Sequence, residues 1–112
     1  MDIQETVSGL TQELRRGTLI LLVLGQLSQP RYGYQLVKRF NEQQIPMDAN
    51  TLYPLLRRLE GQGLLESHWD TGESKPRKYY RITPQGRQVF EETRKIWREY
   101  TQKMETLMED MP

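Results

Sequence analysis

The sequence predicts a mainly α-helical fold with one small β-hairpin, and three observations support this prediction. Leucines recur at helical spacing on one side of residues 51–65, and basic and polar side chains occupy the other side. Two strand-like runs, at 64–69 and 78–83, follow at once and are joined by a polar linker. Apolar side chains then recur at steps of three and four residues from Phe90 to Met111. This order is typical of a winged helix-turn-helix domain with a long C-terminal helix.

The first helix is predicted from Ile3 to Leu24. Its apolar residues alternate steps of four and three, with Gly17 at the missing point of the pattern. The second half is apolar nearly all round, as a helix is when its own domain covers it, whereas the first half is apolar on one side only. We expect that side to form a seam that the small domain does not cover.

Two further helices are predicted before the hairpin. Pro30 ends the first helical segment, because proline disfavours helical geometry in the residue before it, and a second helix then covers 31–41. The third helix is expected to start near Asn50, with Asp48 or Asn50 as its N-cap. This start places Pro54 in the first turn, where its missing N–H group costs little.

The hairpin follows directly after the third helix, which glycine at 61 or 63 ends in the left-handed conformation. Its strands alternate loosely, which predicts that Tyr80 and Ile82 share one face. The linker DTGESKPR is rich in turn-forming residues and is expected to form the tip. Three basic residues are expected to cluster there: Lys75, Arg77 and Lys78.

The last helix opens with Thr83 as N-cap and Pro84 at the first helical position. Its apolar period of 3.5 residues is held over three heptads, which predicts a partner helix, because a monomer would leave large apolar side chains in water. We therefore predict a homodimer, with 1–84 as the winged helix domain and 85–112 as the dimerisation helix. The predicted interface comprises Ile3, Val7, Leu10, Leu14, Phe90, Trp97, Tyr100, Met104 and Leu107.

Composition excludes several classes of function. The chain has no cysteine and one histidine, His68, so thiolate metal sites, disulfides and multi-histidine sites within one chain are ruled out. It also has neither a phosphate-cradling glycine loop nor an evident buried acidic pair, so we expect no enzyme activity, metal or cofactor. The apolar run 19–24 is far shorter than the roughly 18 residues of a membrane helix, and we expect a soluble, cytoplasmic protein.

The net charge of +1 is unevenly distributed along the chain. Residues 31–87 carry ten basic and six acidic side chains, net +4, whereas 1–30 have net −1 and 88–112 net −2. The positive charge lies where the third helix and the hairpin lie, as expected for a protein attracted to phosphate. Double-stranded DNA is the predicted partner, and an incidental basic face on a protein-docking module without ligand sensing is the alternative. The predicted contacts are Tyr34, Lys38, Asn50, Thr51, Tyr53, Arg57, Arg58, Lys75, Arg77 and Lys78.

Three segments, RYGYQL (31–36), TLYPLLRRLEGQGLL (51–65) and RKYYRITPQGR (77–87), resemble the PadR family of bacterial transcriptional regulators in order and spacing. The resemblance implies a winged helix-turn-helix domain, a homodimer made through the first and last helices, and repression by binding a palindromic operator. The short chain with one C-terminal helix is similar to the LmrR-type subgroup of multidrug-binding regulators.

That subgroup implies a ligand site in the last helix. A tryptophan there stacks on flat aromatic molecules at the dimer centre, and Trp97 in RKIWREY occupies the matching place. Arg94 beside it disfavours cationic ligands and favours neutral or anionic planar aromatic ones. The alternative is that Trp97 only anchors the dimer core. The implied ligand-binding residues are Trp97, Thr93, Arg94, Phe90 and Leu14.

Overall fold

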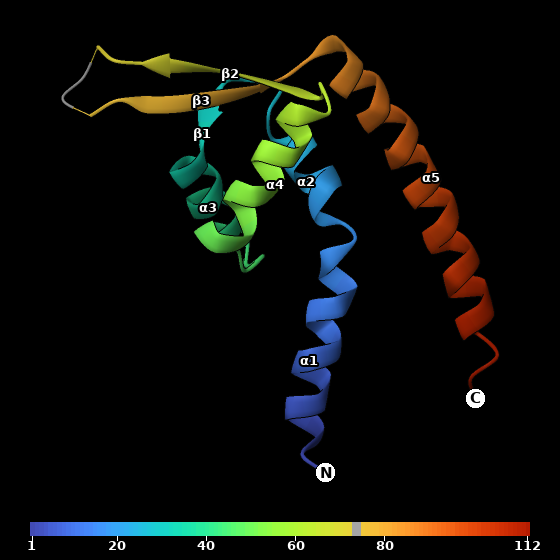
Figure 1. The fold of residues 1–112 in the computed structure, drawn as a ribbon. Helices are drawn as coiled ribbons and strands as arrows, with labels where there is room; N and C mark the ends of the chain where they lie inside the picture. The colour runs from blue at the N-terminus through green and yellow to red at the C-terminus, as the bar shows by residue number, and fades with distance from the viewer. Residues whose placement is uncertain (73–74) are drawn as a thin grey trace.

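The computed structural model describes residues 1–72 and 75–112, which form five helices and a three-stranded antiparallel sheet (Figure 1). The elements follow in the order α1 (Ile3–Arg16), α2 (Leu19–Gly25), β1 (Arg31–Tyr32), α3 (Gly33–Glu42), α4 (Ala49–Gly61), β2 (Leu65–Asp70), β3 (Arg77–Ile82) and α5 (Pro84–Met108). The sheet, α2, α3, α4 and the start of α5 form a head, from which α1 and the rest of α5 project in one direction (Figure 1). The predicted mainly α class with a winged helix is confirmed.

The core of the head lies between α2, α3, α4 and the inner face of the hairpin. The leucine stripe of α4 supplies Leu52, Leu56 and Leu59, which are at most 1% exposed. Tyr80 and Ile82 point into the same core from β3, as the strand alternation predicts. Burying one such side chain fully contributes about 1.5–3 kcal/mol relative to leaving it exposed, so this core fixes α4 against the hairpin.

The sheet has the strand order β1-β3-β2. The hairpin register runs from Leu65 opposite Ile82 to Asp70 opposite Arg77, so the two predicted strands are confirmed within one residue. Of the predicted tip, DTGESKPR, positions 73–74 lie outside the described residues. Gly63 has φ +79° after the end of α4, which confirms the predicted left-handed residue.

The prediction of one continuous helix over 3–24 is wrong. A turn at Gly17 and Thr18 separates α1 from α2. Both the backbone N–H and the hydroxyl of Thr18 bond the carbonyl of Arg15, at 3.1 and 2.9 Å, in place of the helical bond four residues back. Glycine also favours a helix less than any residue except proline, so the gap in the apolar repeat coincides with the break.

The second helix starts two residues later than predicted. Arg31 and Tyr32 pair with β3 as the short strand β1, and α3 begins at Gly33. The amide of Tyr32 donates to the side chain of Gln35 at 3.0 Å, which satisfies a donor at the start of α3. The strand depends on β3, which is distant in sequence, and helical periodicity within 31–41 therefore did not reveal it.

The start of α4 is close to the prediction, but the place of Pro54 is not. Asp48 is the N-cap and accepts from the amide of Thr51 at 2.8 Å, so α4 begins at Ala49. Pro54 therefore lies in the second turn rather than the first, and the bond to the carbonyl of Asn50 is absent. The predicted N-cap of α5 is confirmed, because the hydroxyl of Thr83 accepts from the amide of Gly86 at 2.9 Å.

The projecting helices make the molecule elongated. Its radius of gyration is 16.8 Å, whereas a compact chain of this length has about 13 Å. Residues of α1 are all exposed except Thr11, which is half-buried. Across the described residues, every helix is too short or too polar to cross a bilayer.

Candidate nucleic-acid interface

The outer face of α4 presents most of the predicted contact residues. Asn50, Arg57 and Arg58 are exposed, and Tyr53 is half-buried. The ring of Tyr53 lies on the start of α3, where a Cβ added at Gly33 would be 2.5 Å from it. Gly33 is thus required for this close approach, which holds Tyr53 in place.

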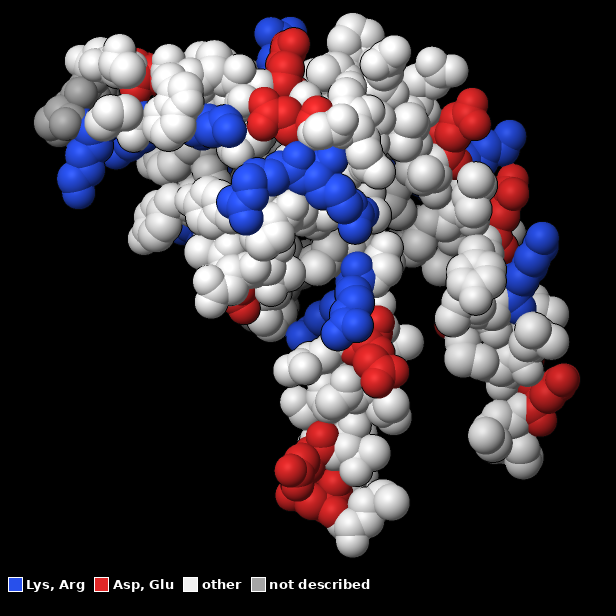
Figure 2. Space-filling model, viewed as in Figure 1, with Lys and Arg blue, Asp and Glu red and all other residues white. Residues whose placement is uncertain are grey.

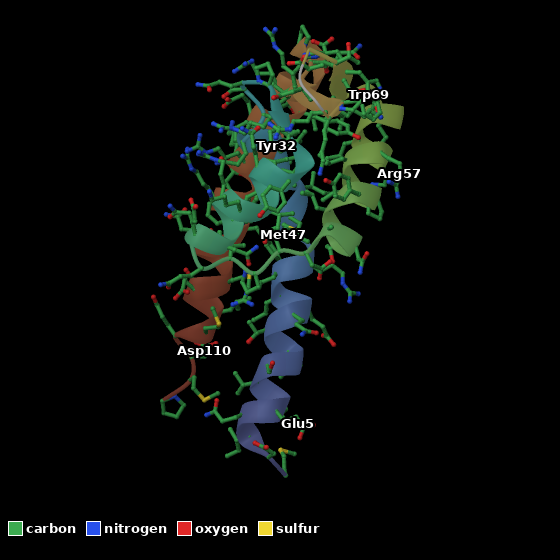
Figure 3. The ribbon with its side chains drawn as sticks, turned by 90° about the vertical axis from the view of Figure 1, so that its left-hand side faces the viewer. Glu5, Tyr32, Met47, Arg57, Trp69 and Asp110 are labelled. Atoms are coloured by element: carbon green, nitrogen blue, oxygen red, sulfur yellow. The ribbon has the colours of Figure 1, made fainter. Side chains whose placement is uncertain are left out.

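A hollow of about 380 Å³ lies between α4 and the hairpin, and we call it the wing groove. Four predicted contact residues line it: Tyr53, Arg57, Arg77 and Lys78. Arg57 and Trp69, one from each wall, lie on the same side of the molecule (Figure 3). The remaining lining residues are Tyr32, Gly33, Pro76 and Tyr80.

The basic residues of the hairpin do not cluster at its tip as predicted. Lys75 is exposed there, whereas the side chains of Arg77 and Lys78 each lie over an aromatic ring. The guanidinium of Arg77 lies 4.6 Å from the ring centre of Tyr32, and the ammonium of Lys78 lies 5.2 Å from that of Tyr80. Both rings attract a cation, and this attraction draws the two charges into the wing groove.

Glu60, in the last turn of α4, joins the helix to both strands of the hairpin. Its carboxylate accepts from the hydroxyl of Ser67 on β2 and lies 3.5 Å from the ammonium of Lys78 on β3. Burial lowers the pKa of Lys78, but Tyr80 and Glu60 outweigh it and raise that pKa above the ordinary value. Lys78 therefore remains a cation at neutral pH, and Glu60 fixes the hairpin relative to α4.

Other predicted contact residues lie outside the wing groove. Thr51 lines a separate hollow of about 790 Å³, in which Arg15 and Arg16 of α1 face the start of α4. Tyr34 and Lys38 line a shallow hollow on α3. Lysine and arginine side chains gather over α4 and the adjoining end of α1, and acidic ones gather at the free end of α1 (Figure 2).

Sequence reasoning missed three residues of this surface: Trp69, Arg15 and Arg16. The arginine pair directly precedes Gly17, where the helix breaks, and the periodicity of the first helix does not show that the pair faces the start of α4. For Trp69 the sequence pattern predicts only a place in a strand. A large apolar side chain near a polar hairpin tip was the available signal.

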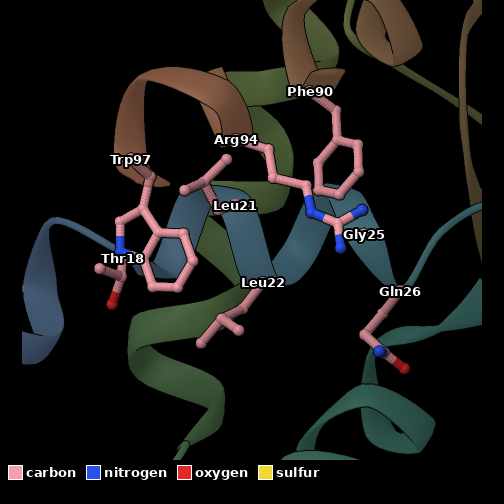
Figure 4. Close-up of a pocket in the computed structure, with 8 residues that line it drawn as sticks. All are labelled: Thr18, Leu21, Leu22, Gly25, Gln26, Phe90, Arg94 and Trp97. Atoms are coloured by element: carbon pink, nitrogen blue, oxygen red, sulfur yellow. The ribbon is translucent and has the colours of Figure 1, made fainter. Parts of the chain in front are cut away.

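A further hollow, of about 450 Å³, lies where α5 crosses α2 (Figure 4). Three predicted ligand residues line it, namely Phe90, Arg94 and Trp97, and the guanidinium of Arg94 lies 5.9 Å from the ring centre of Phe90. Thr93 and Leu14 are not among the lining residues. The rest of the lining is Thr18, Leu21, Leu22, Gly25 and Gln26.

The residues predicted to form a dimer interface follow the projecting helices. Phe90 differs from the others because it is half-buried within the chain, where its ring packs against Gly25. Trp97 is 43% exposed, and Met104 is half-buried. The remaining six are at least half exposed: Ile3, Val7, Leu10, Leu14, Tyr100 and Leu107.

Comparison with known proteins places these features in a family. The model of the transcriptional regulator PadR-like family matches residues 20–92. The chain is 32% identical over 89 residues to the transcriptional regulator Rv3488 of Mycobacterium tuberculosis, covering 79% of this chain and 83% of that protein. A PadR family regulator from Eggerthella lenta has a similar structure, with TM-score 0.92, 54% identity and 95% of each chain covered. A PadR-like regulator from Bacillus cereus is also similar in structure, with TM-score 0.75 and 28% identity, covering 86% of this chain and 96% of that one.

Proposed function

The chain belongs to the PadR-like family of transcriptional regulators, which bind DNA, and from this premise we propose that it is a homodimeric repressor released by a planar aromatic molecule. The observation that supports the proposal is a division of surfaces. Cations and aromatic rings line the wing groove of the head, while the apolar residues of α1 and much of α5 face outward. The division into 1–84 and 85–112 remains part of the proposal.

In the proposed complex, α4 enters the major groove and the hairpin contacts the neighbouring backbone. Asn50 and Thr51 lie at the positive end of α4, which favours phosphate. Arg57 projects one turn beyond Tyr53 and reaches either a guanine edge or a phosphate. The hairpin cations neutralise phosphates on the strand that passes through the wing groove.

The proposed dimer covers the apolar sides of α1 and α5. Leu14 is 72% exposed and Leu107 is 71% exposed, and a second copy is the partner whose helices carry the same repeat. A two-fold axis between the copies sets the two α4 helices at a fixed separation. The dimer therefore addresses two half-sites of a palindrome.

The proposed effector binds in the hollow between α2 and α5, against Trp97, the residue that the resemblance to the LmrR-type subgroup implies for stacking on the ligand. Trp97 offers a flat apolar surface, and Arg94 offers a positive charge near the ring of Phe90. A neutral or anionic aromatic compound suits this pair. Because the hollow lies where α5 meets the head, occupying it shifts α5 against α2 and alters the separation of the α4 helices.

Titration of the protein with labelled duplexes tests DNA binding. Fluorescence anisotropy with the chain's own upstream DNA is compared with a scrambled duplex at several salt concentrations. We expect preference for the upstream DNA, steep weakening with salt, and a loss of at least tenfold for Arg57→Ala. Lys95→Ala is the matched control, because Lys95 is an exposed cation on α5. Binding that is indifferent to sequence would contradict the proposal.

Tryptophan fluorescence tests effector binding. The chain has two tryptophans, so Trp69→Phe leaves Trp97 as the reporter in the hollow. We expect some anionic or neutral planar compounds to quench Trp97, and Trp97→Ala to abolish their binding in calorimetry. If no compound in the panel quenches Trp97, the proposal of effector sensing fails, whereas the proposal of DNA binding stands.

A further inference from the structure

We infer that Trp69 contacts DNA directly, by packing its indole ring on a deoxyribose of the strand that passes through the wing groove. The inference rests on the proposed DNA binding and adds a contact by an uncharged residue. It starts from the position of Trp69 near the outer end of β2, where it lies opposite Lys78 in the register.

Trp69 is exposed although it shares a strand face with the core. Every second residue of β2 lies on the same face, and this face carries Leu65, Ser67 and Trp69. Leu65 at the inner end is 2% exposed. Trp69 at the outer end is 63% exposed, because the hairpin extends beyond the head (Figure 1). The indole therefore overhangs the wing groove and leaves a large apolar surface in water, which a partner can cover.

The charge of the wing groove identifies the kind of partner. Its described lining includes three cations, Arg57, Arg77 and Lys78, and none of the described lining residues is a carboxylate. Glu60 on the helix wall accepts from Ser67 and pairs with Lys78, which offsets part of the charge of Lys78. A chain that alternates negative groups with apolar rings fits this surface, and the sugar–phosphate backbone of DNA does so in every nucleotide.

The position of the indole relative to the cations is fixed. Glu60 bonds Ser67, two residues before Trp69, and pairs with Lys78, directly across from Trp69. The wall that carries Trp69 is thereby held against the wall that carries Arg57. Because deoxyribose is common to all sequences, the contact strengthens binding without selecting a sequence.

The experiment compares Trp69→Ala with His68→Ala by anisotropy on the upstream DNA and on a scrambled duplex. His68 is the matched control, because it is also exposed but stacks on Tyr79 on the opposite face of the hairpin. We expect Trp69→Ala to weaken binding about tenfold on both duplexes, and His68→Ala to leave the affinity unchanged. The slope of log affinity against log salt concentration should stay the same in Trp69→Ala. Arg57→Ala should instead reduce that slope by about one if Arg57 neutralises a phosphate.

A second readout is the fluorescence change on adding DNA. Wild type should show quenching that Trp69→Phe lacks, which reports on the indole itself and not on folding. If wild type binds DNA but Trp69→Ala binds equally well, or the quenching is the same in both proteins, the inference fails and the proposed function stands. A loss confined to the upstream DNA also overturns the inference, because it indicates base reading. Absence of binding to either duplex overturns the proposed function as well.

Discussion

The wing groove and the projecting helices differ in whether contacts within the chain cover their side chains. Both walls of the wing groove come from one chain, and Glu60 and Tyr53 connect α4 to the hairpin and to α3. The projecting part of α5 and the whole of α1 present apolar side chains to solvent, with Leu107 71% exposed. Folding alone therefore forms the wing groove, whereas the apolar sides of the projecting helices would be covered only in the proposed dimer.

In the proposed homodimeric repressor, this difference separates DNA contact from assembly. The chemistry of one half-site contact belongs to a single head, and changes in the wing groove should alter it without altering assembly. The spacing between the two heads of the proposed dimer would depend on α1 and α5. Substitutions in the two regions should accordingly give different signatures, and the following predictions test that separation in order of expected effect.

The largest effect is expected from Leu107→Glu. In a proposed dimer this change buries a carboxylate in the apolar seam, and it should weaken association by about a hundredfold or more. The head should keep its thermal unfolding midpoint, because Leu107 contributes little to it. Sedimentation velocity measures association, and Gln102→Glu, an exposed position on the opposite side of the seam, is the control. Equal association of the two variants would break the comparison.

A smaller effect, on stability, is expected from Gly33→Ala. The added methyl group meets the ring of Tyr53 at 2.5 Å and should lower the free energy of unfolding by about 2 kcal/mol. Gly9→Ala in α1 is the matched control, since its added Cβ meets nothing within 4 Å and alanine favours a helix. Urea titration measures both variants. A Gly33→Ala protein as stable as Gly9→Ala would show that the head tolerates this change.

The smallest effect is expected from Glu60→Gln. Lys78 and Glu60 are each about one-third exposed, so losing their ion pair should lower stability by less than about 1 kcal/mol. The pKa of Lys78 should fall toward its ordinary value, because one of the charges that raise it is gone. NMR titration of the lysine side chains measures this shift. Glu66→Gln, an exposed change on β2, should leave Lys78 unaffected.

Features encoded within a few neighbouring residues were predicted well. The leucine stripe of α4, the alternation of Tyr80 and Ile82, and the Thr83 cap need only local spacing, and the structure confirms each of them. The pairing of β1 depends on β3, which lies more than 40 residues away in sequence, and periodicity contains no such information.

The surroundings of the candidate site residues were predicted only in part, because they too depend on contacts between residues distant in sequence. The basic face of α4 follows from a helical wheel, but the two sides of that face meet different neighbours. Arg57 lines the wing groove, whereas Thr51 faces Arg15 and Arg16 across a separate hollow. The return of Lys78 onto Glu60 is a contact between a strand and a helix, which local sequence does not reveal.

The continuity of α5 from the head to its exposed end has a consequence for the length of this helix. Phe90 anchors its beginning on Gly25, and the helix runs unbroken to Met108. Each residue inserted after Phe90 would rotate everything beyond it by about 100°, so one extra residue turns the seam away from its partner. Seven extra residues restore the orientation and lengthen α5 by about 10 Å. In the proposed dimer, the length of α5 can therefore change only by whole heptads if its apolar side is to keep facing the partner.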